Sequence, residues 1–204
     1  MKSIDPKSLT ERENYKFLIG SVIPRPIAFV TSINEDGVVN AAPFSFFNIV
    51  SSNPPMLSVS VQRKAGVQKD TARNITQQKQ FVVHIVSEDI VRDVNKTAAN
   101  LAPHESEIDE TTFTLVESTV IRVPAVAQAK IRFECELVQH VPLGGEDGQS
   151  GCDLLIGRVV HYHIDEDIYN EQGHIDPVKL QAMSRLAGND YATIGQLLTI
   201  ARPQ

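Results

Sequence analysis

The chain has no tryptophan, only two cysteines and three methionines, and 6% aromatic residues. Cys135 and Cys152 are too few for a disulfide framework and lack the spacing of metal ligands, which favours a reduced, cytoplasmic setting. No apolar run approaches the roughly 20 residues of a membrane-spanning helix. Residues 1–10 are polar and charged, unlike a signal peptide. We therefore expect a soluble protein with no membrane partner.

An excess of positive charge is also absent. The 204 residues include 19 Lys and Arg against 25 Asp and Glu, so the formal net charge is −6. This balance argues against a general role in binding nucleic acid, and it means that any bound anion needs a local basic cluster. With 42% apolar residues the chain can form a sizeable core. Its length suits one domain spanning residues 1–204.

Several segments have the composition or the apolar–polar alternation of β-strands: 26–33, 38–42, 56–61, 81–86, 128–141 and 152–164. Helices are predicted at 69–80, from a capping Ser87 to about residue 97, and briefly within 177–198. Residues 100–113 are expected to form a loop. Many strands joined by short turns predict an antiparallel barrel or sandwich. Because neither GxGxxG nor a P-loop occurs, a Rossmann or Walker site has no support.

A basic cluster follows the strand at 56–61. Its four cations are Arg63, Lys64, Lys69 and Arg73. A phosphate dianion needs such charge together with N–H and O–H donors, which the start of a helix, Lys69 and the hydroxyl of Thr71 would supply. Thr31 and Ser32, at the end of the first strand, offer two more hydroxyls. A solvated helix start capped by Asp70, with turn-capping by the two hydroxyls, remains an alternative.

An aromatic and polar stretch begins at Phe44. Phe46 and Phe47 alternate with Ser45 and Asn48, and no single periodicity fits the run. A flat heteroaromatic ring needs apolar faces and a few donors and acceptors at its edge, which this composition would provide. A core strand of phenylalanines is the alternative.

Other candidate chemistry is weak. His161 and His163 share one face of a strand, but no third ligand is evident, so no metal site is predicted. Glu134 and Glu136 lie on the polar side of the alternating strand at 128–141, and a solvated face is expected there. No nucleophile motif such as GxSxG is present. We therefore predict no catalytic side chain.

Taken in order, the motifs resemble the flavin reductase-like family of FMN-binding split barrels over roughly residues 15–193. The matching pieces are Pro26–Ser32, Gly37–Pro43, Phe44–Asn48, Pro54–Pro55, Lys69–Thr71 with Asn74–Ile75, and Ser184–Tyr191. The resemblance implies a mainly β fold, a six-stranded antiparallel split β-barrel with flanking helices. It also implies a homodimer that binds FMN near the dimer interface with residues from both chains.

The resemblance also assigns cofactor-binding residues. Those expected around the phosphate are Thr31, Ser32, Arg63, Lys69, Asp70 and Thr71. Those expected near the isoalloxazine are Ser45, Phe46, Phe47, Asn48, Ser60 and Gln62. Arg185 and Tyr191, in the late motif, are expected to help close the site.

The function implied is transfer of a hydride from NAD(P)H to N5 of the flavin. The electron acceptor of the reduced flavin would be oxygen, a partner monooxygenase or a metal complex. Two alternatives stay open. One is a flavin-binding electron carrier or storage module without nicotinamide-dependent activity. The other is a relative of the pyridoxamine-phosphate-oxidase type with a different substrate.

Overall fold

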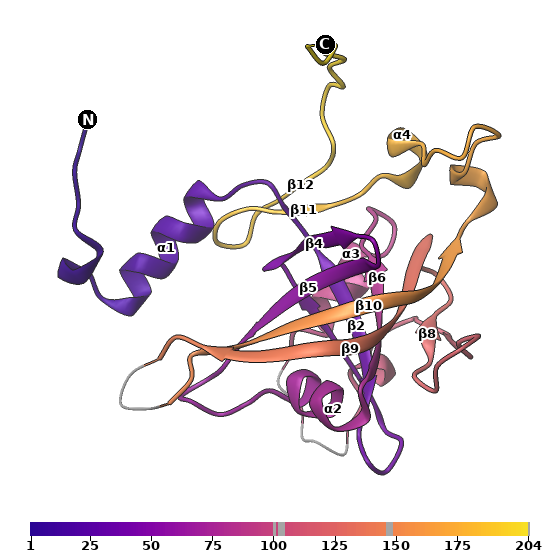
Figure 1. Ribbon diagram of the computed structural model, residues 1–204, viewed down its shortest axis with the longest axis horizontal. Coiled ribbons are helices and arrows are strands. Elements are labelled where there is room, and N and C mark those ends of the chain that lie inside the picture. Colours follow the sequence, from indigo (N-terminus) through magenta and orange to yellow (C-terminus); the bar gives the residue numbers. More distant parts are fainter. Residues whose placement is uncertain (100, 102–104, 146–148, 204) are drawn as a thin grey trace.

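Seven strands form one antiparallel sheet in the computed structural model, which describes residues 1–99, 101, 105–145 and 149–203 (Figure 1). The strands are β2 (Ala28–Ile33), β3 (Val39–Phe44), β4 (Phe47–Ser52), β5 (Pro55–Gln62), β6 (Gln80–Ile85), β9 (Ile131–Leu143) and β10 (Cys152–Ile164). Their order in the sheet is β3–β2–β6–β9–β10–β5–β4. The two edges, β3 and β4, follow each other in the sequence, so the sheet curves into a barrel that stays open between them.

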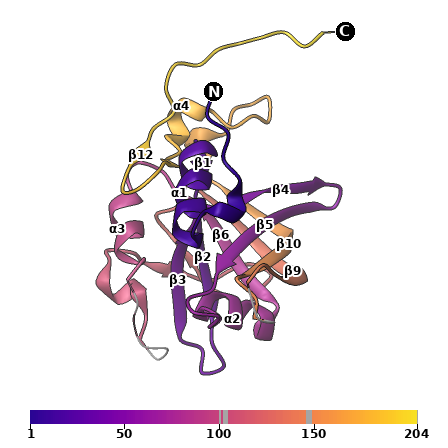
Figure 2. The same cartoon turned by 90° about the vertical axis from the view of Figure 1, so that its left-hand side faces the viewer.

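Short elements flank this barrel (Figure 2). The helices are α1 (Glu11–Ser21), α2 (Asp70–Gln78), α3 (Val91–Lys96) and α4 (Pro177–Leu180), with short 3-10 turns at Pro6–Ser8, Glu107–Glu110 and Glu166–Ile168. Two further pairings are small: β1 (Arg25–Pro26), β11 (Ser184–Arg185) and β12 (Tyr191–Ala192) form one sheet, and β7 (Leu115–Val116) pairs with β8 (Ala125–Val126). None of the helices in this described part of the chain is both long and apolar enough to cross a bilayer.

The barrel core follows from strand alternation. Leu57, Val59 and Val61 of β5 point inward, and Leu155 of β10 lies opposite Val59. Helix α2 closes one end of the barrel, where the buried Ile75 joins the same cluster (Figure 1). Because side chains of a strand alternate between faces, the outward residues between them remain partly exposed. This leaves a polar row on the outer side of β5.

Close packing inside the barrel depends on one glycine. Gly157 lies at a register shift between β9 and β10, and a Cβ there would stand 2.3 Å from the ring of Phe81. That contact is far shorter than van der Waals separation, so a larger residue would displace Phe81 from the core.

A buried histidine joins β6 to its surroundings. His84 shares a hydrogen bond with the carbonyl of Phe29 through Nδ1 at 2.9 Å, and its Nε2 accepts from the N–H of Val126 at 2.9 Å. Burial lowers the pKa of His84 to about 4, so the ring is neutral at physiological pH. The acceptor role of Nε2 places its proton on Nδ1. His84 therefore has a structural role.

The mainly β fold class is confirmed, and the strand segments predicted from alternation all occur. The strand number differs, because residues 47–52 add a seventh strand where no periodicity was visible. Strand β4 is an edge strand with a bulge between Ile49 and Ser51, so most of its side chains are exposed and no alternation is required.

The helix boundaries also differ from the pattern. Helix α1 was not predicted, although Thr10 and Glu13 form a capping box at its start. Helix α3 begins at Val91 rather than at a Ser87 cap, because the Ser87 hydroxyl donates to Asp89 instead. Residues 100 and 102–104 of the expected loop lie outside the described residues, and 107–110 form a 3-10 turn.

The expectation of a solvated Glu134 is wrong. This side chain is fully buried because the segment after β7 crosses the outer face of β9. Its carboxylate accepts from the backbone N–H groups of Thr119, Val120 and Ile121 at 2.6, 2.8 and 3.2 Å, and it contacts Nε2 of His163 at 2.6 Å. Burial alone would raise the pKa of Glu134, but these hydrogen bonds outweigh it and hold the pKa below its ordinary value.

Replacing Glu134 by Gln is expected to lower the free energy of unfolding by about 2 kcal/mol at pH 7, because the loop loses charge-assisted hydrogen bonds. Since the folded-state pKa lies below the ordinary value of 4.5, this contribution is present above that pH and is lost as the pH falls through the folded-state pKa. Urea unfolding at pH 7 and below pH 4 measures both effects.

Glu136→Gln is the matched control. Glu136 lies on the same strand, 44% exposed, and pairs with Arg158. A surface pair of this kind contributes little, so a change within about 0.5 kcal/mol is expected. Equal effects of the two substitutions would contradict the role assigned to Glu134.

Candidate functional site

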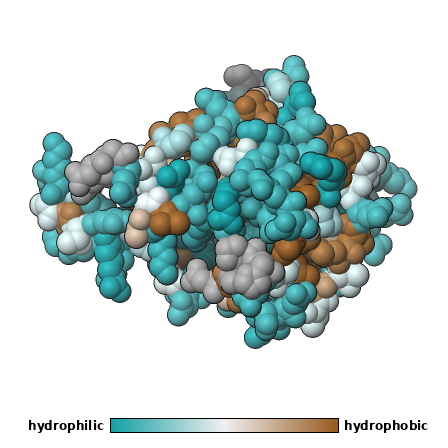
Figure 3. Space-filling view, turned by 90° about the horizontal axis from the view of Figure 1, so that it is seen from below, coloured by the Kyte–Doolittle hydropathy of each residue, from teal (hydrophilic) through white to brown (hydrophobic). Residues whose placement is uncertain are grey.

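The basic cluster surrounds the start of α2. Lys69 is the N-cap residue, and its side chain is exposed and makes no capping hydrogen bond. Asp70 stands in the first turn rather than at the cap, and it forms an ion pair with Arg73 one turn later. The first-turn N–H groups and the helix dipole give this end of α2 a partial positive charge. Figure 3 views the molecule from this end and shows a mainly hydrophilic surface.

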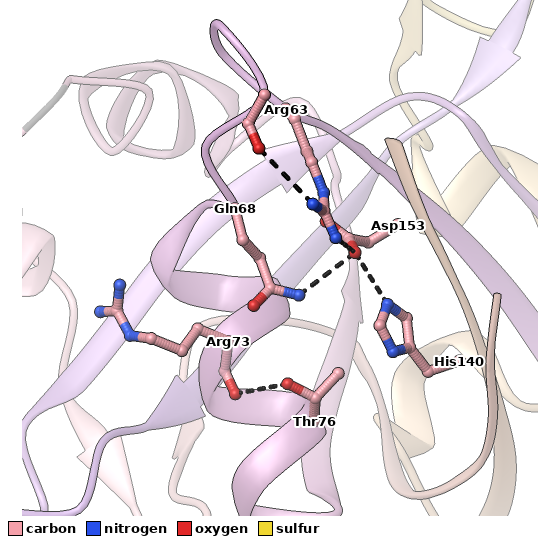
Figure 4. A network of polar contacts seen from close by, with 7 residues as sticks. Arg63, Gln68, Arg73, Thr76, His140 and Asp153 are labelled. Carbon is pink, nitrogen blue, oxygen red and sulfur yellow. Dashed lines mark hydrogen bonds and ion pairs between the residues drawn. The ribbon is translucent and has the colours of Figure 1, made fainter. Parts of the chain in front are cut away.

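Arg63 is held by a buried carboxylate (Figure 4). Its Nε and Nη2 donate to the two oxygens of Asp153 at 2.9 and 2.6 Å. Gln68 donates to the same carboxylate at 3.2 Å, and Nε2 of His140 lies 2.7 Å from it. Asp153 is fully buried, which would raise its pKa, but the Arg63 and His140 hydrogen bonds hold the pKa below its ordinary value. The network ties the loop between β5 and α2 to the β9–β10 hairpin.

These pairings divide the four cations by role. Arg63 and Arg73 are neutralised by Asp153 and Asp70, and the Arg73 side chain points away from the Asp153 network (Figure 4). Within the described residues, Lys64 and Lys69 have no ion-pair partner, and both are exposed. Two lysines therefore carry the charge that is available to an anion at the start of α2.

The predicted hydroxyls do not meet on one edge. Thr31 and Ser32 point to opposite faces of β2 and both are fully buried. Thr31 donates to the carbonyl of Pro124 at 2.8 Å. Ser32 accepts from Asn74 of α2 at 3.4 Å, so it lies on the same side as α2.

Ser32 and Thr71 belong to one buried polar cluster between β2, β3 and α2. Asn40, opposite Ser32 in the β2–β3 register, donates to the Thr71 hydroxyl at 2.8 Å. The Oδ1 atom of Asn74 is buried and accepts no hydrogen bond from the described residues. Thr71 thus anchors the first turn of α2 to the sheet, and the residue is 2% exposed.

The aromatic stretch lines a pocket of about 410 Å³, hereafter the ring pocket. Ser45, Phe46, Phe47 and Asn48 all contribute to its wall. Its other lining residues are Leu18, Val22, Pro24, Arg25, Pro26 and Ser58. Helix α1 therefore forms one side of the ring pocket, and β4 with β5 forms the other. Phe44, by contrast, is buried in the barrel core.

A polar row leads from the ring pocket toward the basic cluster. Ser58 lies opposite Asn48 in the β4–β5 register, and Ser60 donates its backbone N–H to the carbonyl of Phe46 at 2.8 Å. Gln62 follows on the same face and donates to the Ser60 hydroxyl at 3.3 Å. From Ser58 to Gln62 the strand covers about 13 Å. The row suits the polar ribityl chain of FMN between a ring at one end and a phosphate at the other.

A second and more apolar pocket, about 500 Å³, adjoins the ring pocket. The two pockets share Pro26, Phe47 and Asn48. Met56, Leu57, Ile85, Phe133, Val159 and Tyr162 are among its other lining residues. Phe47 thus stands between two cavities.

Arg185 and Tyr191 lie on β11 and β12, in the small sheet with β1, and neither is among the residues that line the ring pocket. The Arg185 guanidinium stacks over the Tyr191 ring at 4.5 Å from its centroid and donates to the carbonyl of Asp190. Tyr191 donates to Asn95 of α3 at 3.0 Å. Strand β11 pairs with β1 so that Arg185 lies opposite Arg25. Arg185 and Tyr191 therefore support β11, which pairs with β1, and Arg25 and Pro26 of β1 line the ring pocket.

Sequence reasoning missed Arg25. This residue is 6% exposed, yet it lines the ring pocket. A lone cation between Pro24 and Pro26 carries no periodic or motif signal that separates it from a surface residue. An arginine fixed between two prolines in extended backbone is the one hint that the sequence offers.

We expect the two halves of the basic cluster to respond differently to substitution. Arg63→Gln leaves the buried Asp153 without its main partner, so the free energy of unfolding should fall by about 3 kcal/mol. Lys69→Gln removes an exposed cation beside the positive end of a helix and should change it by less than about 0.5 kcal/mol. Denaturant unfolding of both variants measures the two changes in the free energy of unfolding. A large loss for Lys69→Gln, or none for Arg63→Gln, would refute this division.

Comparison with known proteins gives a family match and a similar relative. Residues 19–179 match the model of the flavin reductase like domain. The chain is 52% identical over 196 residues to the uncharacterized protein YwrF of Bacillus subtilis (strain 168), covering 96% of each chain.

Two solved structures are similar as well. Nitrilotriacetate monooxygenase component B from Bacillus cereus is 54% identical, with a TM-score of 0.96 and 98% of each chain covered. Pseudomonas fluorescens 2-nitrobenzoate 2-nitroreductase NbaA is 32% identical, with a TM-score of 0.88 and coverage of 99% of this chain and 96% of that one. The chain, a split β-barrel, belongs to the flavin reductase-like domain family.

Proposed function

We propose that this protein binds FMN and passes a hydride from NAD(P)H to the flavin, as an oxidoreductase of the flavin reductase type. Membership of the family supports the reaction class. The observation that carries the proposal is the polar row of Ser58, Ser60 and Gln62, which leads from the ring pocket toward two exposed lysines without an ion-pair partner among the described residues. A ring, a polyol chain and a phosphate need these three environments in this order.

Different residues would bind the ring and the phosphate of FMN. Phe46 and Phe47 would pack against the ring, while Ser45 and Asn48 would offer donors and acceptors to its edge. Lys69, with the first-turn N–H groups of α2, would hold the phosphate. Bound FMN supplies the hydride acceptor, so the chain needs to orient two rings and exclude water rather than provide an acid or base.

The buried hydroxyls play an indirect part in this proposal. Ser32 and Thr71 position the first turn of α2 through Asn40 and Asn74. Arg63 fixes the preceding loop through Asp153. These residues keep Lys69 and the helix start in place, so the phosphate site is organised from beneath by groups that are already paired.

Two relatives support specific extensions. One similar structure is the component B of a nitrilotriacetate monooxygenase, which favours a partner monooxygenase as the acceptor of electrons. Another is a 2-nitrobenzoate 2-nitroreductase, in keeping with redox chemistry at a flavin. The two free cysteines fit a cytoplasmic location, where thiols stay reduced.

A homodimer is part of the same proposal. Helix α1 extends away from the barrel and exposes Phe17, Leu18 and Val22 (Figure 1). Strand β4 exposes Ile49, which lines the second pocket, and Val50. Exposed apolar side chains on α1 and on β4, two elements that contribute to the ring pocket, suit burial against a second copy of the chain. A second copy would then complete the flavin site.

Anaerobic mixing of the FMN-loaded protein with NADH or NADPH tests the hydride transfer. We expect one of the nucleotides to bleach the flavin absorbance in a rapid, saturable phase. Dithionite should bleach the same sample and serves as the control for a reducible flavin. If dithionite reduces the flavin but neither nucleotide does, the protein is a carrier or store of flavin rather than a reductase.

Lys69→Ala is expected to weaken FMN binding by about 1–3 kcal/mol, or roughly five- to 150-fold in the dissociation constant, because a charged hydrogen bond to phosphate is lost. Quenching of flavin fluorescence gives the constant. Lys79→Asn is the matched control, since Lys79 lies in a left-handed conformation at the other end of α2 and asparagine tolerates that backbone. An unchanged constant for Lys69→Ala would place the phosphate elsewhere.

A further inference from the structure

Arg25 is a buried cation that has no counter-ion among the described residues. Its Nη1 donates to the carbonyl of Ile19 at 2.7 Å and also to that of Val22, and its Nη2 donates to the carbonyl of Leu186 at 2.8 Å. Its Nε lies 3.5 Å from the Ser45 hydroxyl, which is a long hydrogen bond. The carbonyls of Ile19 and Val22 belong to the C-terminal end of α1, so the helix dipole offsets part of the charge, but none of these partners carries a full negative charge.

The surroundings of Arg25 add positive charge. No carboxylate in the described ranges forms an ion pair with Arg25. Arg185 lies opposite it across the β1–β11 pairing, so two guanidinium groups stand on neighbouring strands. Burial lowers the pKa of Arg25, Tyr15 opposes this and Arg185 adds to it, but an arginine remains charged at neutral pH.

A buried charge without a partner is unfavourable, and proteins normally neutralise it. The charge also faces a cavity, because Arg25 lines the ring pocket beside Ser45 and Asn48. Both facts are explained if the ring pocket holds a ligand that becomes negative during turnover.

We propose that Arg25 sets the redox potential of the flavin by stabilising the negative charge that hydride transfer leaves on the ring. The inference rests on the proposed function, since it requires FMN in the ring pocket. Transfer of a hydride moves two electrons and one proton from the nicotinamide to flavin N5, so the ring gains one negative charge and the nicotinamide one positive charge. A fixed cation in a partly desolvated pocket favours the first of these changes.

A cation in this position stabilises reduced flavin more than oxidised flavin. The neutral oxidised ring gains little from Arg25, whereas the reduced anion gains its full electrostatic attraction. The protein should therefore bind reduced FMN more tightly than oxidised FMN. By thermodynamic linkage the midpoint potential of bound FMN is then more positive than that of free FMN.

The midpoint potential of bound FMN in wild type, Arg25→Gln and Arg25→Lys provides the test. We expect Arg25→Gln to reduce the preference for reduced FMN by tenfold or more, which shifts the two-electron potential by about 30 mV or more to the negative side. Arg25→Lys keeps a charge and should restore most of the shift. Arg158→Gln removes an exposed arginine on β10 and should leave the potential unchanged.

The outcomes separate this inference from the proposed function. Failure of wild type to bind FMN would overturn both. Binding of FMN with equal potentials in wild type and Arg25→Gln would overturn the role of Arg25 alone. If Arg25→Gln does not fold, the wild-type potential decides: a value at or below that of free FMN contradicts the inference, and a more positive value supports it. A purely structural role predicts that both redox states weaken equally, with no change in potential.

Discussion

The buried carboxylate of Asp153 is the interaction on which the candidate site depends. It lies at the start of β10 and holds Arg63, Gln68 and His140 in one network. That network fixes the loop between β5 and α2 against the barrel. The loop in turn decides where the exposed Lys64 and Lys69 stand. A single desolvated charge thus orders the segment that carries the available positive charge.

Positive charge is used in two different ways along the site. At the start of α2 the charge is exposed, so water and salt screen it. At the ring pocket the charge of Arg25 is buried and held by neutral carbonyls, which suits a response to charge that appears only on reduction. The polar row on β5 connects the two. An acidic protein can bind an anionic cofactor because its cations are placed locally rather than in excess.

Much of the fold could be predicted from the sequence, since the alternation in β5 and β9 follows directly from one buried and one exposed face. The failures share a cause. Glu134 occupies an outward-facing position of β9, as the alternation predicts. The loop after β7 covers this position, so the side chain is buried. Strand β4 is exposed on most sides, so no pattern marks it. Neither effect is encoded within the strand itself.

The candidate site shows the same difference between features set by neighbouring residues and features set by other segments of the chain. Residues near each other in the sequence, such as Ser45–Asn48, do line one pocket. Thr31 and Ser32 are adjacent but point to opposite faces, as strand geometry requires. Arg25 escaped notice because its partners, Ile19, Val22 and Leu186, are backbone carbonyls that come from α1 and the segment after β11. Contacts of side chains to backbone carbonyls leave no mark in a single sequence, because every residue type offers the same carbonyl.

We propose that the phosphate of FMN binds at the start of α2 while the ring of FMN lies in the ring pocket. Calorimetric titration of the wild-type protein with FMN and with riboflavin, at low and at high salt, tests it most directly. The account predicts that FMN binds at least tenfold more tightly than riboflavin, and that added salt reduces this advantage because the lysines are exposed. Equal affinities for the two flavins, or an advantage of FMN that salt does not change, would contradict it.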